Sequence, residues 1–209
     1  DPARPIRKFE TPKTEGHKTW TRNDFEKFRA HWEIDTAQRL AFELLYRSCA
    51  AIVDMTKLGP GLVTDGWLTY ERQKSGSMAA VPWVPNVAPD WFEWRDDLEI
   101  ALACRPRHMT YLVTTLGRPK SKKSASSWFS QACNDAGLPD LSAHGIRKGR
   151  AAFFRENGTT QDQRMAVLGH ETEEEESHYS RSADLRRIIT GTKVPTPIRK
   201  LEKFREKNQ

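Results

Sequence analysis

The pattern of apolar and polar positions predicts two helices near the start of the chain. Apolar residues recur at helical spacing over residues 21–32, where Thr21 is the candidate N-cap, and again over residues 34–58, until a GPG sequence interrupts the pattern. The candidate core residues of the two helices are Phe25, Phe28 and Trp32 in the first and Leu40, Leu44 and Leu45 in the second.

A two-residue alternation then replaces the helical spacing. WLTYERQK and AAVPWV alternate as strands do, and Ser75 and Gly76 form a turn between them. Residues 67–84 therefore predict an antiparallel hairpin whose turn displays Lys74. Residues 110–115, TYLVTT, predict one further short strand.

Helical spacing returns in the rest of the chain. Residues 90–105 predict an amphipathic helix, and residues 124–137 predict a helix closed by Gly137. Four successive helices are expected after these, over residues 142–156, 160–168, 172–179 and 182–190. The pattern predicts a mainly α fold with a small antiparallel β-sheet.

Composition limits the organisation of the chain and its partners. A chain of 209 residues buries one core, so we expect one domain over residues 21–190, between a proline-containing arm (residues 1–20) and a basic tail (residues 191–209). Lys and Arg outnumber Asp and Glu by 34 to 28, and the net charge of +6 favours a polyanionic partner. No apolar run reaches membrane-spanning length, and the first residues do not form a signal peptide.

The three cysteines stand apart from one another. Cys49, Cys104 and Cys133 form no CxxC pair, which argues against a disulfide framework and against a cysteine zinc site. This usage is typical of a reducing cytoplasm. Histidines and glutamates near the end of the chain form no HExxH pair, so we expect neither a metal nor another cofactor.

Three short motifs near the end of the chain carry the candidate chemistry. HGIR places His144 and Arg147 three residues apart on one helix face, LGH ends a later helix at His170, and Tyr179 follows nine residues after that histidine. Each motif alone is a common accident, because surface helices, helix ends and amphipathic tyrosines all occur widely. Their shared order, spacing and intervening helix breaks make the combination informative. Arginine suits a phosphate because its rigid fork binds two oxygens and stays charged.

On these motifs, residues 20–190 resemble the catalytic domain of the tyrosine recombinases, the phage-type integrase family. In that family HxxR lies on one helix, LGH ends a later one, and the nucleophilic tyrosine follows nine residues on, which matches His144, Arg147, His170 and Tyr179. The hairpin lysine of the family falls on Lys74. The resemblance also implies an N-terminal DNA-binding domain, joined through the arm of residues 1–20.

The resemblance implies a mechanism of DNA strand cleavage and rejoining. Tyr179 attacks a backbone phosphate and forms a covalent 3′-phosphotyrosine, which conserves bond energy for the rejoining step. Arg147 and His170 stabilise the charge on the nonbridging oxygens, His144 takes the tyrosine proton or holds the phosphate, and Lys74 protonates the departing 5′-oxygen. Nearby cations are expected to favour the ionised form of Tyr179.

The chain departs from the family at its first arginine. Aligning Asp54 with the acidic residue of the family pattern puts Ala51 where the arginine belongs. Arg47 lies one helical turn earlier and could reach toward the same face, but its Cα is displaced by about 6 Å, which is long for a precise bidentate clamp. Three explanations remain: divergence with a substitute donor, deliberate replacement that traps a complex, or a protein that binds DNA but cleaves poorly.

Other charged residues are weaker candidates. Lys148 and Arg150 follow the HxxR motif and are candidate phosphate contacts, and Lys120, Lys122 and Lys123 lie in a basic segment that either follows a phosphate backbone or is simply solvated. The acidic run of residues 173–176 is expected to be a solvated face that points away from DNA.

The expected partner is double-stranded DNA. By the resemblance, the protein is a homotetramer on DNA, a monomer or weak oligomer when free, and a bacterial cytoplasmic enzyme of a phage or mobile element. Its tail, residues 191–209, resembles the segment that docks onto a neighbouring protomer. Two alternatives to site-specific recombination remain: a catalytically weakened DNA-binding relative, because of Ala51, and a type IB topoisomerase, which uses the same chemistry to relax supercoils.

Overall fold

The computed structural model describes residues 16–183, 185 and 188, and most of its regular structure is helical. Over these residues a small three-stranded antiparallel sheet, of order β1-β2-β3, accompanies the helices. This arrangement confirms the predicted fold class. The elements are α1 (Arg22–His31), α2 (Ala37–Ser48), α3 (Ile52–Met55), β1 (Val63–Thr64), β2 (Trp67–Glu71), β3 (Met78–Pro82), α4 (Leu98–Ala103), α5 (Lys122–Asp135), α6 (Ala143–Glu156), α7 (Gln161–Leu168) and α8 (Glu173–Ser180), with short 3₁₀ turns at Pro60–Leu62 and Pro85–Val87.

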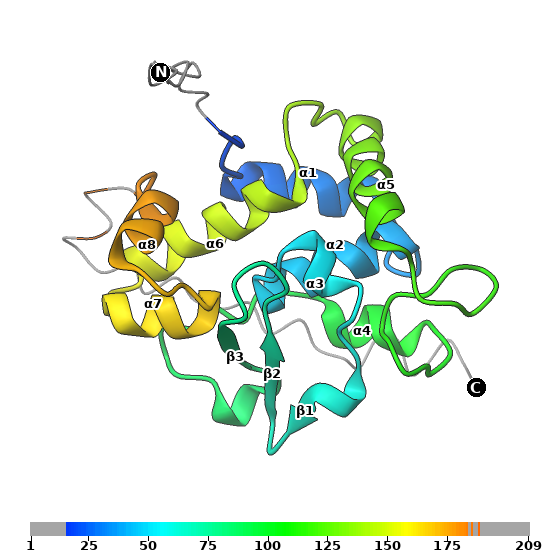
Figure 1. Ribbon diagram of the computed structural model, residues 1–209. Helices are drawn as coiled ribbons and strands as arrows, with labels where there is room; N and C mark the ends of the chain where they lie inside the picture. Colours follow the sequence, from blue (N-terminus) through cyan, green and yellow to red (C-terminus); the bar gives the residue numbers. More distant parts are fainter. Residues whose placement is uncertain (1–15, 184, 186–187, 189–209) are drawn as a thin grey trace, which may run out of the picture.

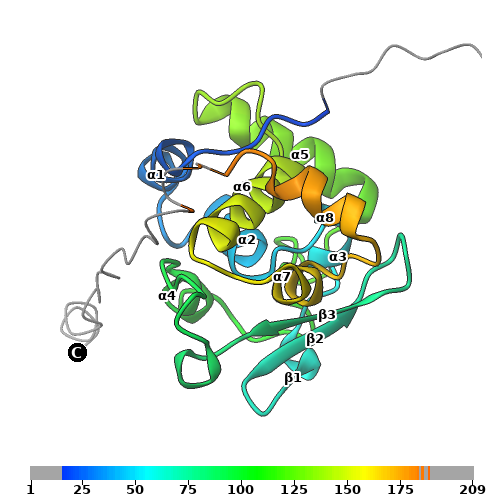
Figure 2. The ribbon, with the colours of Figure 1, turned by 90° about the vertical axis from the view of Figure 1, so that its left-hand side faces the viewer.

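The helix α6 occupies the middle of the molecule (Figure 1). It packs against α2, α5, α7 and α8, and α7 packs in turn against the strand β3. Figure 2 shows the sheet along one side of the helices, with α7 next to β3. The helix that carries the HxxR motif is therefore held from several directions.

Aromatic side chains fill the core where α1, α2 and α5 meet. Thr21 forms a capping box with Asp24 and begins α1 as predicted, because the two side chains satisfy backbone N–H groups that have no partner within the helix. Phe28 is fully buried, with its ring 4.8 Å from the ring of Phe42 and 5.6 Å from that of Phe129. The predicted core residues Phe25, Phe28, Leu40, Leu44 and Leu45 are all buried, and Trp32 packs against them partly buried.

The last residues of the arm also belong to this packed structure. Trp20 is buried in the core, its backbone N–H donates to the carbonyl of Gly145, and its indole Nε1 donates to the carbonyl of Ser142. A Cβ on Gly145 would lie 2.2 Å from the carbonyl oxygen of Lys18. The glycine of the HxxR motif therefore lets residues 18–20 lie directly across α6.

The prediction of one continuous helix over residues 34–58 is wrong. The helix α2 ends at Ser48, Cys49 adopts a left-handed conformation with φ of 53°, and α3 begins only at Ile52. The Ser48 hydroxyl donates to the carbonyl of Leu44 and accepts from the backbone N–H of Ala50, so local bonds replace the helical ladder. Helical spacing continued through the break because apolar residues on both sides face the same core.

Two other predictions differ from the structure. Only residues Leu98–Ala103 of the predicted helix 90–105 are helical, because Phe92 packs on Phe154 and Asp96 binds Arg47 from irregular backbone. The predicted strand 110–115 forms a single bridge, between Val113 and Pro119. The predicted helix 182–190, like the arm before residue 16 and the tail 191–209, lies wholly or largely outside the described residues.

We predict that Phe28→Ala lowers the free energy of unfolding by about 3–5 kcal/mol, because the cavity it leaves is enclosed by other aromatic rings. Urea unfolding of the purified chain measures this change. The control Met109→Ala removes a side chain that is 91% exposed and leaves the unfolding free energy nearly unchanged. An equal effect of the two substitutions would contradict the assignment of the core.

Candidate active site

Three helical segments bring the four motif residues together. His144 and Arg147 project from α6, His170 follows the end of α7, and Tyr179 lies in the last turn of α8. The Tyr179 ring centroid is 5.1 Å from that of His144 and 4.6 Å from that of His170, and the Arg147 guanidinium carbon lies 5.4 Å from the same centroid. Residues that lie from 9 to 35 positions before Tyr179 in the sequence thus surround its ring.

Arg147 is held by the ends of two helices. Its Nη1 donates to the carbonyl of Cys49 at 2.7 Å, just beyond α2, and its Nη2 donates to the carbonyl of Leu168, the last residue of α7. Carbonyls at helix C-termini have no partner within the helix and carry partial negative charge, so they suit a buried cation. Nε is buried and has no hydrogen-bond partner among the described residues. That donor remains free for an anion.

Both histidines are neutral at neutral pH. Burial, followed by the charges of His17, Lys148, Arg147 and Lys74, lowers the pKa of His144 to about 4. Burial, followed by Arg147, Arg72 and His144, lowers the pKa of His170 to about 3. Neither ring nitrogen of His170 has a hydrogen-bond partner in the described part of the chain. Neutral imidazoles can accept or donate a proton at a reacting oxygen.

Nearby cations act on the pKa of Tyr179 in the expected direction, but in the free protein burial outweighs them. Burial is the largest influence and raises the pKa of Tyr179 above its usual value, and Glu175 adds to this effect. Arg147 and Arg72 act in the opposite direction without overcoming it. The hydroxyl is therefore protonated in the resting site, and a base must remove its proton before it can attack.

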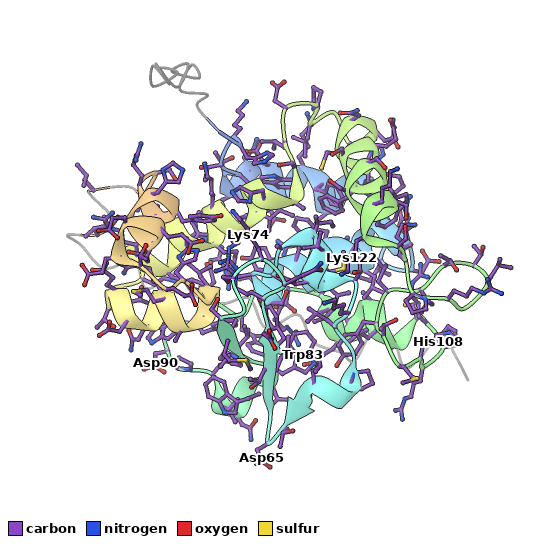
Figure 3. The ribbon with its side chains drawn as sticks, viewed as in Figure 1. Asp65, Lys74, Trp83, Asp90, His108 and Lys122 are labelled. Atoms are coloured by element: carbon purple, nitrogen blue, oxygen red, sulfur yellow. The ribbon has the colours of Figure 1, made fainter. Side chains whose placement is uncertain are left out.

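Lys74 lies in the exposed turn between β2 and β3, as predicted (Figure 3). Its charge contributes to the lowered pKa of His144, which puts the ammonium within electrostatic reach of the motif residues. The hairpin end is fixed to α3, because the backbone N–H of Gln73 donates to the Asp54 carboxylate at 2.9 Å.

The position of the missing arginine lies beside the site. Ala51 is the half-buried N-cap residue of α3, two residues after the carbonyl that Arg147 binds. Arg47 does not replace the missing side chain. It is 1% exposed, pairs with Asp96 and stacks on Trp94, with its guanidinium carbon 4.3 Å from a Trp94 ring centroid.

Arg72 is a site residue that we did not predict. It is 6% exposed, its Nη1 donates to the carbonyl of Gly169, and its charge influences the pKa of His170 and of Tyr179. Gly169 has a φ of +60°, and a Cβ there would lie 2.7 Å from Cδ of Arg72, so the glycine of LGH makes room for this side chain. The strand alternation contained the signal, since Arg72 follows Leu68 and Tyr70 on the buried face.

His17 of the arm also reaches the site unpredicted. Its ring centroid is 4.7 Å from that of His144, and its Nδ1 lies 3.1 Å from the Ser142 hydroxyl. Its carbonyl accepts a hydrogen bond from Nζ of Lys148 at 3.0 Å. A single arm histidine in a proline-containing, charged segment gave no pattern that would have placed it there.

The candidate phosphate contacts divide into buried and exposed residues. The prediction that Arg150 contacts a phosphate is wrong, because this side chain is fully buried among Tyr46, Phe92 and Phe154. Lys148 is 6% exposed, and its amine binds the arm. Among the predicted basic segment, Lys120 lies over the Trp128 ring at 4.1 Å, and Lys122 (Figure 3) and Lys123 are exposed in the first turn of α5.

The acidic run of residues 173–176 is not entirely a solvated face, as we had expected. Glu176 is 1% exposed and binds Arg164 through both carboxylate oxygens, at 2.5 and 3.2 Å. Glu175 is half-buried, and its Oε1 lies 3.4 Å from Nη2 of Arg72 and 3.7 Å from Nε2 of His170. The run anchors α8 and turns one carboxylate toward the site.

Two searches of the described residues returned nothing. No group of three or more His, Cys, Asp or Glu side chains there is arranged to hold a metal ion. Nor does any helix in the described ranges combine the length and apolar character that crossing a membrane requires.

No protein-family model matches the sequence, and no curated protein matches it. Solved structures do match. A lambda integrase dimer bound to a COC′ core site matches with a TM-score of 0.64 and 21% identity, over 78% of this chain and 59% of that one. The lambda integrase catalytic core matches with a TM-score of 0.60 and 21% identity, over 74% of this chain and 92% of that one.

XerA recombinase matches with a TM-score of 0.66 and 13% identity, over 85% of this chain and 65% of that one. The chain covers 49% to 62% of the longer lambda integrase chains. Identities this low show the fold alone. The protein therefore has the fold of tyrosine recombinase catalytic domains.

We predict that Glu176→Ala lowers the free energy of unfolding by about 3–5 kcal/mol, because it leaves the buried Arg164 without its partner. Urea unfolding measures the change, and Glu174→Ala, at an exposed neighbouring position, is the matched control. Replacing both partners, with Arg164→Met and Glu176→Leu, is expected to be less destabilising than Glu176→Ala alone. The prediction fails if Glu176→Ala and Glu174→Ala unfold alike.

We predict that stability falls as the pH is lowered below about 6.5 towards about 3, partly through the two site histidines. The folded-state pKa of each lies below its unfolded value of 6.5, so the unfolded chain binds protons that the folded chain excludes. Urea unfolding across this range measures the slope. His170→Gln should make the fall shallower than in the unsubstituted chain, and an unchanged slope would show that His170 is not held neutral.

Proposed function

We propose that this chain cleaves and rejoins DNA strands through a covalent 3′-phosphotyrosine on Tyr179, in site-specific recombination. The observation that carries the proposal is the contact of one tyrosine ring with two neutral imidazoles, beside the buried Arg147. The fold that the chain shares with recombinases and the net charge of +6 add support.

In the proposed reaction the Tyr179 oxygen forms a bond to phosphorus, and the bond from phosphorus to the 5′-oxygen breaks. His144 accepts the tyrosine proton, and Lys74 supplies a proton to the departing 5′-oxygen. Arg147, through its free Nε, and His170 donate to the nonbridging oxygens. Rejoining reverses these steps, so neither water nor a nucleotide cofactor is consumed.

Entry of the DNA phosphate changes the proton affinities of both His144 and Tyr179. The resting site has lowered histidine pKa values and a raised Tyr179 pKa, which opposes transfer from Tyr179 to His144. A bound phosphodiester adds one negative charge among these groups and thereby raises the pKa of each imidazole. Substrate binding thus makes His144 a stronger base. Because the same negative charge also raises the pKa of Tyr179, the charges of Arg147 and Arg72 are what favour loss of the tyrosine proton.

The proposed substrate is double-stranded DNA, with Lys120, Lys122 and Lys123 contacting its backbone. Lys148 would join them only after its amine leaves the carbonyl of His17. Assembly of four copies on DNA is part of the proposal, and one of the similar structures is a lambda integrase tetramer bound to a Holliday junction. The full reaction is expected to need a further DNA-binding domain.

Ala51 favours one alternative function, a relative that binds DNA and cleaves it slowly. Loss of one preorganised donor commonly reduces the rate on the order of a hundredfold or more. Such a protein would still form a specific complex with DNA. A type IB topoisomerase would instead relax plasmids of any sequence, so plasmid relaxation without a required site would select that alternative.

We predict that the protein forms an adduct with DNA that survives denaturing detergent. The probe is a pool of nicked duplexes with randomised sequence, in which the short fragment released by cleavage diffuses away and traps the intermediate. Sequencing of the trapped strands reports the site, and mass spectrometry of the digested adduct is expected to find the phosphodiester on Tyr179.

Tyr179→Phe should abolish the adduct, because it removes the attacking oxygen. Tyr111→Phe is the matched control, since Tyr111 stacks on Trp83 at 5.6 Å, away from the motif residues, and the adduct should persist. An adduct that forms in Tyr179→Phe would refute this nucleophile. Absence of an adduct in both the unsubstituted chain and Ala51→Arg would refute the enzymatic function.

A further inference from the structure

The site lacks the guanidinium expected at Ala51, yet a second buried guanidinium is present. Ala51 offers only a methyl group, two residues after the carbonyl that Arg147 binds, and Arg47 is occupied by Asp96. Arg72 reaches the same group of residues from the hairpin, where it binds the carbonyl of Gly169. Its charge is among the influences on the pKa values of Arg147, His170 and Tyr179.

We propose that Arg72 binds a nonbridging oxygen of the scissile phosphodiester and takes the place of the arginine absent at Ala51. This assignment rests on the proposed function, because the phosphodiester is the substrate of that reaction. It adds a catalytic residue at a position that the motif pattern does not contain.

The contacts of Arg72 leave donors for a phosphate. One donor, Nη1, is fixed on the carbonyl of Gly169, which orients the planar fork beside His170. Nε is buried without a hydrogen-bond partner in the described residues, and Nη2 has only a long contact of 3.4 Å to Glu175. A buried guanidinium with an unsatisfied donor is costly to keep, so an oxyanion there is strongly favoured.

Glu175 shows where such an oxyanion would sit. Its Oε1 approaches both Nη2 of Arg72, at 3.4 Å, and Nε2 of His170, at 3.7 Å, and the side chain is 34% exposed. A carboxylate oxygen is a fair substitute for a phosphate oxygen, because both are anionic acceptors of the same donors. Both distances exceed those of a normal hydrogen bond, so a phosphate that enters from solvent can displace this carboxylate.

The backbone holds Arg72 close to the position of the missing residue. Gln73, its neighbour, donates its backbone N–H to Asp54, which lies in the short helix that Ala51 caps. Because Gly169 has no Cβ, the Arg72 side chain fits directly against it. The hydrogen bond to the Gly169 carbonyl then fixes Arg72 to the LGH turn. The hairpin, α3 and the end of α7 therefore keep the Arg72 side chain in one place before DNA binds.

The first test measures anion binding without DNA. Tungstate, a tetrahedral dianion, is titrated into the whole chain while the imidazole NMR signals of His144 and His170 are followed. We expect both signals to shift. We expect Arg72→Ala to weaken the affinity for tungstate on the order of tenfold or more, because the substitution removes charged hydrogen-bond donors. Gln73→Ala, at the next and exposed position, is the matched control and should bind as the unsubstituted chain does.

A second pair of variants leaves Arg72 in place. Glu175→Gln removes the carboxylate that occupies the anion position and should tighten tungstate binding severalfold, whereas Glu174→Gln, which is exposed, should have little effect. This pair remains informative if Arg72→Ala folds poorly. Equal tungstate affinity in the unsubstituted chain and in a folded Arg72→Ala would overturn the proposal, as would the absence of any tungstate shift at both histidines.

The third test uses the adduct assay with the trapped DNA site. We expect Arg72→Ala to slow adduct formation on the order of a hundredfold, Arg72→Lys to slow it less, and Ala51→Arg to restore part of the rate in the Arg72→Ala background. A rate unchanged by Arg72→Ala would overturn the assignment while leaving Tyr179 as nucleophile. If no DNA is ever trapped, the proposed function fails, and the tungstate comparison alone still decides whether Arg72 holds an anion.

Discussion

The site depends on one buried cation, Arg147, and on the two helix ends that receive it. Its guanidinium bonds join the carbonyl that follows α2 to the last carbonyl of α7, so α6 cannot shift without losing both. The left-handed turn at Cys49 is needed to direct that first carbonyl, and a non-glycine residue in this conformation costs roughly 1–2 kcal/mol. The chain accepts this local strain because, without the Cys49 carbonyl, Nη1 of the buried guanidinium would lack an acceptor as Nε already does.

Arg147 also determines the electrostatics of its neighbours. Burial is the leading cause of the low pKa of His170, and the charge of Arg147 is the next. The same charge opposes the rise in the pKa of Tyr179, which burial and Glu175 produce. A site with a concentrated positive charge, neutral imidazoles and a protonated tyrosine is at rest until an anion enters it. An entering anion supplies the missing negative charge and raises the pKa of both imidazoles.

Much of the fold could be predicted from the sequence, because in those elements the local sequence pattern and the tertiary packing favour the same structure. Thr21 caps α1, the LGH glycine ends α7, and Ser75 and Gly76 lie in the hairpin turn, each for a reason that acts within a few residues. The errors occurred where long-range contacts decide. The helix break at Cys49 lets its carbonyl accept a hydrogen bond from Arg147, 98 residues later. The irregular segment 90–97 lets Asp96 pair with Arg47, 49 residues earlier.

The candidate site divides in the same way. His144, Arg147, His170 and Tyr179 could be found because their spacing is fixed along the chain. The prediction for Arg150 is wrong because a basic residue in a helical sequence does not indicate which face of the helix is buried. In the structure, Arg150 lies on the buried face of α6, against three aromatic rings.

Arg72 carried a local signal, the strand alternation, but its meaning required the fold. A side chain on the buried face of β2 would ordinarily be apolar, as Leu68 and Tyr70 are. An arginine there is stable only if the structure provides acceptors, and Gly169 provides one. Burial makes this position unfavourable for an arginine without an anionic partner. Burial also strengthens the attraction between the guanidinium and a bound anion, because water is excluded. Under the proposed assignment, the guanidinium of Arg72 supplies from the hairpin the donor that Ala51 lacks.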